Sequence, residues 1–223
     1  MLVPMRAILD AADKNGYAQG AFNVNAVCQV KAAVDVHQIL RSPAIIQGAD
    51  LANGFMGGRT DFANSTLEDK KAGAKNIGAA VKKYAADSDI PVALHLDHGK
   101  NFDSCIAAIE GGYTSVMIDG SSLPFDENVE LTREVVKYAH ERGVTVEGEL
   151  GVLAGVEDHV FAATSTYTNP LSAIDFFEKT GVDALAISYG TMHGANKGKN
   201  AVIRKEIAIA IKPSCMEIAN LSP

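Results

Sequence analysis

Six short apolar runs alternate with longer amphipathic segments along this chain, and this alternation restricts the fold more than any other feature. The runs that read as strands lie at residues 20–23, 44–47, 92–97, 115–119, 145–149 and 184–188. The segments with helical periodicity lie at residues 26–40, 67–86, 102–110, 127–142 and 171–179. Short apolar strands that end in polar residues are typical of a buried parallel sheet. The order predicts an α/β fold of parallel βαβ units with right-handed crossovers, and one long loop over residues 54–68.

Length and composition favour one large domain with a sizeable core, since the chain has 223 residues, 47% of them hydrophobic and 21% charged. No apolar run approaches the roughly 18 residues of a membrane span, and the N-terminus does not resemble a secretory signal. The net charge is −7 without a basic stripe, which excludes nucleic acid and membranes as expected partners. Cys28, Cys105 and Cys215 are far apart and odd in number, which favours the reducing cytoplasm.

Residues 93–99, Ala-Leu-His-Leu-Asp-His-Gly, place two histidines and a carboxylate where an apolar run stops. Because side chains alternate along a strand, His95 and Asp97 are expected to share one face, while His98 lies at the strand's end. Such residues indicate a site at the C-terminal mouth of a parallel sheet. The alternative is a set of structural histidines, each of which would need a buried partner.

Polar residues recur at the ends of the other predicted strands, among them Asn23, Asp119, Glu149 and His193. A rolled βα sheet would bring these strand ends around one axis. His98 and His193 are then candidate zinc ligands through neutral imidazole nitrogens. Asp119 and Glu149 would either orient those imidazoles or hold a second cation.

Four motifs occur in an order that resembles one known family. They are Leu-His-Leu-Asp-His-Gly at 94–99, Ser-Val-Met-Ile-Asp-Gly at 115–120, Glu-Gly-Glu-Leu-Gly at 147–151 and His-Gly-Ala-Asn-Lys at 193–197. Two further runs, Ala-Phe-Asn-Val-Asn at 21–25 and Pro-Phe-Asp-Glu-Asn-Val at 124–129, add to the match. Together they resemble the class II fructose-bisphosphate aldolases, zinc-dependent TIM (β/α)8-barrel enzymes that include tagatose-bisphosphate aldolases. The resemblance covers roughly residues 1–212, which we predict to form the barrel domain.

The resemblance implies reversible cleavage of a ketose bisphosphate to dihydroxyacetone phosphate and glyceraldehyde 3-phosphate. His98 and His193 would ligate the zinc ion, which would polarise the substrate ketone. Asp97 would exchange a proton with the C4 hydroxyl. Glu157 matches the family's mobile-loop carboxylate, which handles the proton at the dihydroxyacetone phosphate carbon.

The resemblance also implies the residues that surround the substrate and the metal. Asn23 would line the substrate pocket, while Lys197 and the backbone around Gly194 would bind a phosphate group. Asp119 and Glu149 match carboxylates near the family's alternative metal position, and a monovalent cation is a further expected cofactor. A homo-oligomer, either a dimer or a tetramer, is the expected assembly.

The sequence departs from the family pattern toward its C-terminus. No histidine follows His193, although the family carries a third zinc ligand on a later strand. Pro213 is expected to break the last helical pattern, and we predict that residues 213–223 form an atypical tail. Only about six of the eight βα units of a closed barrel are present, so we expect exposed sheet edges. A second departure is Ala49, where many family members carry a serine that contacts phosphate.

Several assignments have structural competitors. Asp119 could cap a helix, Glu157 could be an exposed loop charge and Lys197 could belong to a solvated basic loop. His37 and His140 read as ordinary helix-surface residues. Three functions are open from the sequence: a fructose-bisphosphate aldolase, a related aldolase for tagatose bisphosphate or another ketose, and a truncated, non-catalytic remnant that acts in assembly or binding.

Overall fold

The computed structural model describes residues 1–151, 155–157, 160–162, 167–191 and 202–221, and it contains one six-stranded parallel sheet. In spatial order, its strands are β1 (Ala21–Asn23), β2 (Ala44–Ala49), β3 (Val92–Gly99), β4 (Ser115–Ile118), β5 (Thr145–Leu150) and β8 (Ala184–Ile187). A separate antiparallel pair is formed by β6 (Gly155–Glu157) and β7 (Val160–Ala162). All six predicted parallel strands are confirmed.

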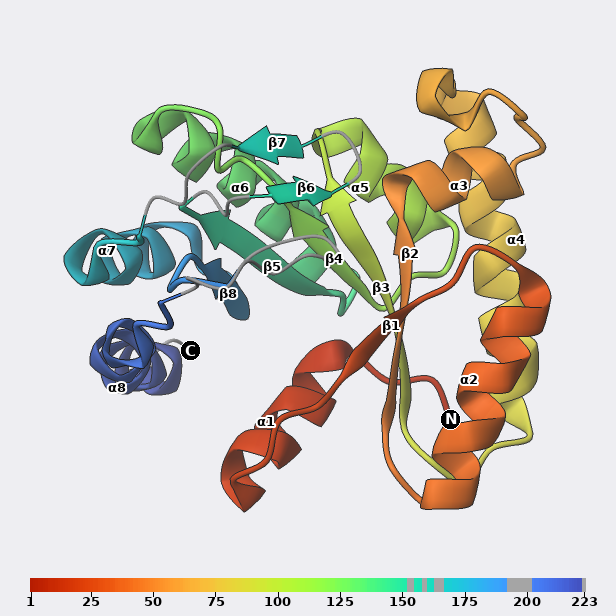
Figure 1. Cartoon of the computed structure of the whole chain (residues 1–223), viewed down its shortest axis with the longest axis horizontal. Coiled ribbons are helices and arrows are strands. Elements are labelled where there is room, and N and C mark those ends of the chain that lie inside the picture. Colours follow the sequence, from red (N-terminus) through yellow and green to blue (C-terminus); the bar gives the residue numbers. More distant parts are fainter. Residues whose placement is uncertain (152–154, 158–159, 163–166, 192–201, 222–223) are drawn as a thin grey trace.

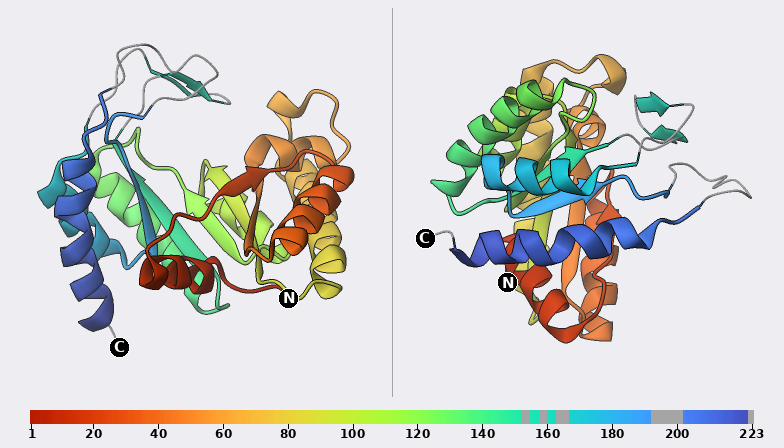
Figure 2. Two further views of the ribbon diagram at one scale, coloured as in Figure 1. Left: turned by 60° about the horizontal axis from the view of Figure 1, so that its bottom comes forward. Right: turned by 90° about the vertical axis from the view of Figure 1, so that its left-hand side faces the viewer.

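Helices cover the outer face of this curved sheet, as Figures 1 and 2 show. They are α2 (Val27–Leu40), α4 (Leu67–Ala86), α5 (Phe102–Glu110), α6 (Phe125–His140), α7 (Pro170–Thr180) and α8 (Lys205–Leu221). Ile46, Leu94 and Leu96 point into the core beneath them and are fully buried. Each such side chain contributes about 1.5–3 kcal/mol to stability.

The N-terminal helix α1 (Met5–Asn15) packs on the opposite, inner face of the sheet. Its residues Met5 and Ile8 form a second small core with Ile45 of β2 and Ala93 of β3. Since side chains alternate along a strand, the residues that follow Ala93 on this inner face are His95 and Asp97. The alternation therefore directs the polar residues of β3 to the inside of the curved sheet.

The described strands form an open half-barrel in which β1 and β8 are the edges. Within the described part of the chain, β1 pairs only with β2, and β8 pairs only with β5. A cavity of about 1050 Å³ lies beside β8, lined by residues of α1, α7 and α8. The predicted class, a TIM-barrel type α/β fold with six βα units, is thus confirmed. No described helix combines the length and apolarity needed to cross a membrane.

The predicted loop over residues 54–68 is confirmed only in part: residues 57–61 and 65–66 lie outside helices, whereas α3 (Asp50–Met56), the 3-10 helix η1 (Phe62–Asn64) and the start of α4 cover the rest. Buried Asp50 at the start of α3 forms an ion pair with Lys70 of α4. The two helices approach so closely that a Cβ on Gly73 would lie 1.7 Å from the Asn53 carbonyl oxygen. Tertiary packing thus stabilises a short helix that contains both an asparagine and a glycine.

The predicted helix break at Pro213 is wrong, because α8 continues through this residue. Proline removes one backbone hydrogen bond, but its ring is tolerated here on the exposed side of the helix. Ile207, Ile211 and Cys215 recur every four residues on the buried face. Their packing against the core holds both halves of α8 in one helix.

Candidate metal centre

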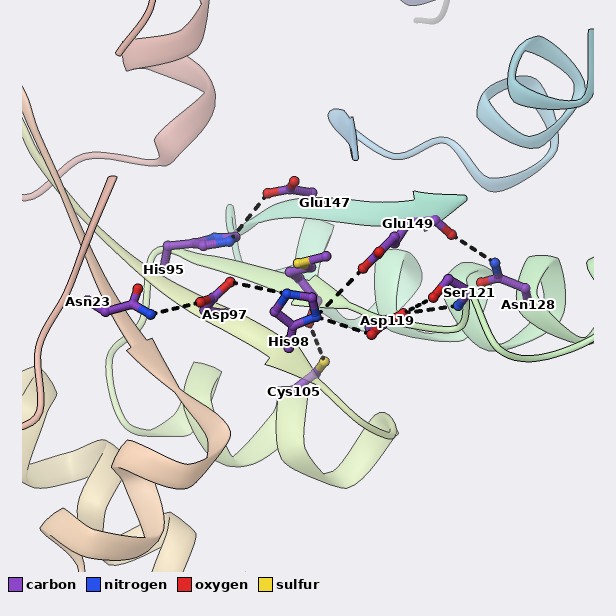
Figure 3. A network of polar contacts seen from close by, with 11 residues as sticks. Asn23, His95, Asp97, His98, Cys105, Asp119, Ser121, Asn128, Glu147 and Glu149 are labelled. Atoms are coloured by element: carbon purple, nitrogen blue, oxygen red, sulfur yellow. Dashed lines mark hydrogen bonds and ion pairs between the residues drawn. The ribbon is translucent and has the colours of Figure 1, made fainter. Parts of the chain in front are cut away.

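Three polar side chains meet where the central strands β3, β4 and β5 end (Figure 3). His98 lies on β3, Asp119 follows β4 directly and Glu149 lies on β5. One ligand atom from each of these residues lies within 4.8 Å of the others. The structure therefore brings together three of the four residues predicted to surround a metal.

His98 reaches this cluster because β3 contains a bulge. Leu96 pairs with Val116 and Gly99 pairs with Ile118, so Asp97 and His98 together oppose the single residue Met117. His98 adopts a left-handed φ of 50°, a conformation that costs about 1–3 kcal/mol outside glycine. A bulge of this kind redirects a side chain, and here it turns His98 toward Asp119 and Glu149.

His98 lies at the end of its strand, as predicted, since only Gly99 follows it in β3. Gly99 has to be a glycine because a Cβ there would lie 2.6 Å from the Met117 carbonyl oxygen and 2.9 Å from Cys105 Sγ. The Cys105 thiol also donates to the Met117 carbonyl, with an S–O distance of 3.7 Å. The irregular part of β3 is therefore closely packed against β4 and α5.

The distances within the cluster fit a divalent cation. His98 Nδ1 lies 3.1 Å from Asp119 Oδ2 and 3.6 Å from Glu149 Oε2. Ligand atoms bound at about 2.0–2.1 Å to a tetrahedral zinc ion lie about 3.3 Å from one another. Ser121 donates to Asp119 Oδ1 from both its backbone N–H, at 3.1 Å, and its hydroxyl, at 2.6 Å. These two bonds fix the carboxylate with its other oxygen toward His98.

Glu149 provides the clearest sign that a cation belongs here. Its Oε2 atom is buried and has no hydrogen-bond partner among the described residues. Burial, together with the negative charge of Asp119, raises the pKa of Glu149 to about 8. A buried carboxylate oxygen that accepts no hydrogen bond and lies beside a second carboxylate is unfavourable unless a positive charge lies next to it, either on His98, 3.6 Å away, or on a bound cation. The nitrogen and oxygen donors suit zinc, so the residues present fit the predicted metal.

The same surroundings shift the pKa of the other two residues. Burial alone would lower the pKa of His98, but the hydrogen bond to Asp119 and the charges of Asp97 and Glu149 raise it to about 9. Burial alone would raise the pKa of Asp119, but its hydrogen bonds to His98 and Ser121 lower it to about 2. In the absence of a metal, a protonated imidazole thus supplies the positive charge that the carboxylates require.

Asp97 and Asn23 meet beside the cluster, as expected for two residues at strand ends. Asn23 Nδ2 donates to Asp97 Oδ2 at 3.1 Å, although β1 and β3 are separated by β2. The other carboxylate oxygen, Oδ1, lies 4.0 Å from His98 Nε2. The predicted proton-transfer residue and the predicted substrate-pocket residue are therefore in direct contact next to the candidate metal ligand.

His95 is a structural histidine with buried partners, the alternative considered for this motif, and it is not one of the three candidate metal ligands. Its buried ring contacts Ser115 Oγ through Nδ1 at 2.8 Å and lies 3.3 Å from Glu147 Oε2 through Nε2. The sequence interpretation missed these partners, and also Asn128, which binds the backbone of Glu149. Glu147 could have been found, because it lies two residues before Glu149 on the same face of β5.

The remaining predicted site residues lie outside the part of the chain whose side chains are described. They are Glu157, His193, Gly194 and Lys197, of which Glu157 has only its backbone described, in β6. Their roles stay predictions. The interpretation of His37 as a surface residue is wrong, because its ring is buried against Phe22 and contacts the Ala33 carbonyl oxygen at 2.8 Å.

Comparisons with known proteins agree on one family. A sequence model described as "Fructose-bisphosphate aldolase class-II" matches residues 3–219. The chain is 48% identical over 200 residues to a fructose-bisphosphate aldolase of Treponema pallidum, covering 88% of this chain and 56% of that protein. It is 40% identical over 208 residues to a fructose-bisphosphate aldolase of Staphylococcus aureus, covering 92% of this chain and 68% of that protein.

A solved structure gives the same result at the level of the fold. The crystal structure of the YdjI aldolase from Escherichia coli K12 superposes with a TM-score of 0.75 at 30% identity. The match covers 96% of this chain and 70% of that one. The chain thus spans between about half and 70% of the length of these relatives.

Proposed function

Because the chain belongs to the class II fructose-bisphosphate aldolase family, we propose that it catalyses the reversible, zinc-dependent cleavage of fructose 1,6-bisphosphate. The products are dihydroxyacetone phosphate and glyceraldehyde 3-phosphate. The observation that carries this proposal is the convergence of His98, Asp119 and Glu149 next to the Asp97–Asn23 pair. A set of metal ligands next to a fixed carboxylate provides what aldol cleavage needs, namely a position for a Lewis acid and a base.

His98 would hold the zinc ion together with Asp119 or Glu149, and His193 is proposed as a further ligand. A bound zinc ion supplies Lewis acidity, which draws electron density from the substrate ketone. Glu149 and Asp119 contribute the negative charge that retains a divalent cation in a buried site.

Asp97 acts as the base in cleavage. It accepts the proton of the C4 hydroxyl, the C3–C4 bond breaks as the C4 carbonyl forms, and the electron pair stays on C3. Asn23 keeps Asp97 in place by donating to Oδ2, so that one carboxylate oxygen is oriented toward His98. Glu157 is proposed to return a proton to C3, and condensation reverses these steps.

Substrate binding and assembly complete the proposal. Lys197 and the backbone around Gly194 are proposed to bind a phosphate group of the sugar, and a monovalent cation is proposed as a further cofactor. A homo-oligomer in the cytoplasm is the proposed form of the protein.

A cleavage assay coupled to triose phosphate detection tests the function. We expect activity that is lost with a chelator and restored by Zn²⁺. Asp97→Asn should lower kcat about 10²–10⁴-fold while zinc is still bound, as expected for loss of a positioned base. Asp175→Asn is the matched control, because it makes the same change at a half-buried residue of α7 that is not part of the cluster. Full activity without any bound metal would reject the mechanism.

The same assay separates the other functions that the sequence leaves open. Fructose and tagatose bisphosphates are C4 epimers, so the ratio of their kcat/KM values identifies the preferred substrate. Absence of both tight, stoichiometric zinc and cleavage of either sugar would favour a non-catalytic role in assembly or binding, whereas tight zinc binding would count against that alternative.

A further inference from the structure

One motif of the resemblance has no role in the proposed reaction, namely Pro-Phe-Asp-Glu-Asn-Val at residues 124–129. It forms the start of α6, and its Asn128 is only 1% exposed. A primary amide rarely occupies such a position unless its hydrogen bonds are satisfied. Its partners therefore indicate what the motif does.

The amide of Asn128 is held in one orientation by two bonds. Its Nδ2 donates to the backbone carbonyl of Glu149 at 2.9 Å, and the hydroxyl of Thr132 donates to its Oδ1 at 3.2 Å. Because the Glu149 carbonyl can only accept, the nitrogen of the amide must face it, and the oxygen is left to accept from the Thr132 hydroxyl. Figure 3 shows Asn128 on the far side of Glu149 from His98.

The oxygen of the same amide lies against a second part of the site. A Cβ on Gly120 would come within 2.2 Å of Asn128 Oδ1, so the backbone that directly follows Asp119 passes right over this amide. One side chain of α6 thus touches the ends of both strands that carry the candidate metal carboxylates. Glu149 is contacted through its carbonyl oxygen, and Asp119 through the adjoining glycine.

We propose that Asn128 is a positioning residue for the metal centre, which sets the spacing between Asp119 and Glu149 by fixing the backbone that carries each of them. This inference rests on the proposed function, because it assumes that the cluster binds Zn²⁺. Metal affinity depends strongly on such supporting contacts, whose loss typically weakens binding 10–100-fold. A purely structural asparagine would instead contribute to stability without changing the ligand set.

Zn²⁺ binding to the full chain, measured by competition with a chelator, distinguishes these roles. Asn128→Leu keeps the branched shape and the number of heavy side-chain atoms but removes both hydrogen bonds, and we expect its zinc affinity to fall 10–100-fold. The visible absorption of bound Co²⁺ should shift as well, because the carboxylates move relative to His98. Thr132→Val keeps Asn128 but frees its oxygen, and we expect a smaller loss of about threefold to tenfold.

Val135→Ala is the matched control, because Val135 is a buried residue of the same helix with no contact to the cluster among its described interactions. It should lower the urea midpoint while leaving zinc affinity and the Co²⁺ spectrum unchanged. If Asn128→Leu does not fold, Thr132→Val carries the test. Wild-type zinc affinity and an unchanged Co²⁺ spectrum in the folded variants would overturn the inference and leave the proposed function intact. A wild-type protein that binds neither metal would contradict both.

Discussion

Zinc binding by this protein should depend steeply on pH, because the metal must displace protons from its own ligands. Without metal, His98 has a pKa of about 9 and Glu149 a pKa of about 8, whereas Asp119, with a pKa of about 2, is already ionised near neutrality. At pH 7 the free site therefore carries a proton on each of His98 and Glu149. Both protons leave when the cation binds, so raising the pH favours binding.

The size of the effect follows from counting these protons. Each displaced proton changes the apparent affinity tenfold per pH unit, or about 1.36 kcal/mol. Between about pH 7 and pH 8 two protons leave, so affinity should rise about 100-fold per unit, equivalent to about 2.7 kcal/mol. Between the two pKa values only His98 still releases a proton and the slope falls to about tenfold per unit. Above about pH 9 the affinity should level off.

Calorimetric titration with Zn²⁺ in buffers of different ionisation enthalpy measures this proton release directly. We expect about two protons per zinc ion at pH 7. Glu149→Gln should reduce the release to about one, whereas Asp175→Asn, which makes a like change far from the cluster, should leave it at about two. A release close to zero at pH 7 would refute the reasoning, since it would mean that the carboxylates and the imidazole are not coupled as the distances indicate.

Two further changes test the support of the site and of the sheet. Gly99→Ala should disrupt the β3 bulge, because its Cβ would lie 2.6 Å from the Met117 carbonyl oxygen; we expect at least tenfold weaker zinc binding, and wild-type affinity in a chelator competition would contradict this. Asp183→Asn should lower the free energy of unfolding at pH 7 by about 2–3 kcal/mol in urea titrations, because the buried carboxylate accepts bonds from His140, Arg6 and the Val146 N–H. Those hydrogen bonds and the two cations outweigh burial and lower the pKa of Asp183, so its contribution is fully present above about pH 4 and is lost as the pH falls through the folded-state value. If the free energies of unfolding of the wild type and Asp183→Asn differed equally at pH 7 and pH 2, the result would be inconsistent with this lowered pKa.

Periodicity predicts the sheet of this protein well because its strands are short, apolar and buried. The predicted helix at 67–86 agrees with α4, whose Thr66 and Asp69 form a capping box that the sequence displays directly. Helix α3 was not predicted, because it depends on contacts with α4 that no local pattern reveals. The passage of α8 through Pro213 likewise depends on packing of its buried face, which local propensity does not contain.

In the candidate site, too, some features follow from the local sequence and others depend on tertiary structure. Residue type and strand position correctly group Asp97, His98, Asp119 and Glu149 at one end of the sheet. The left-handed conformation of His98 could not be predicted, since strict alternation would turn its side chain away from Asp97. Buried Asn128 was also missed, because a polar residue in the first turn of an amphipathic helix ordinarily faces solvent.

The order of strands in the sheet has a consequence for how the protein opens. Strands β3 and β4 are each hydrogen-bonded on both sides, whereas β1 is only three residues long, consists of exposed residues and lies at the edge of the sheet. Amide hydrogen exchange should therefore be fastest in β1 and slowest in the central strands. Asn23 would then leave Asp97 during brief fraying events that leave His98 and Asp119 in place, so a bound cation should be retained through fluctuations that already interrupt the proposed reaction.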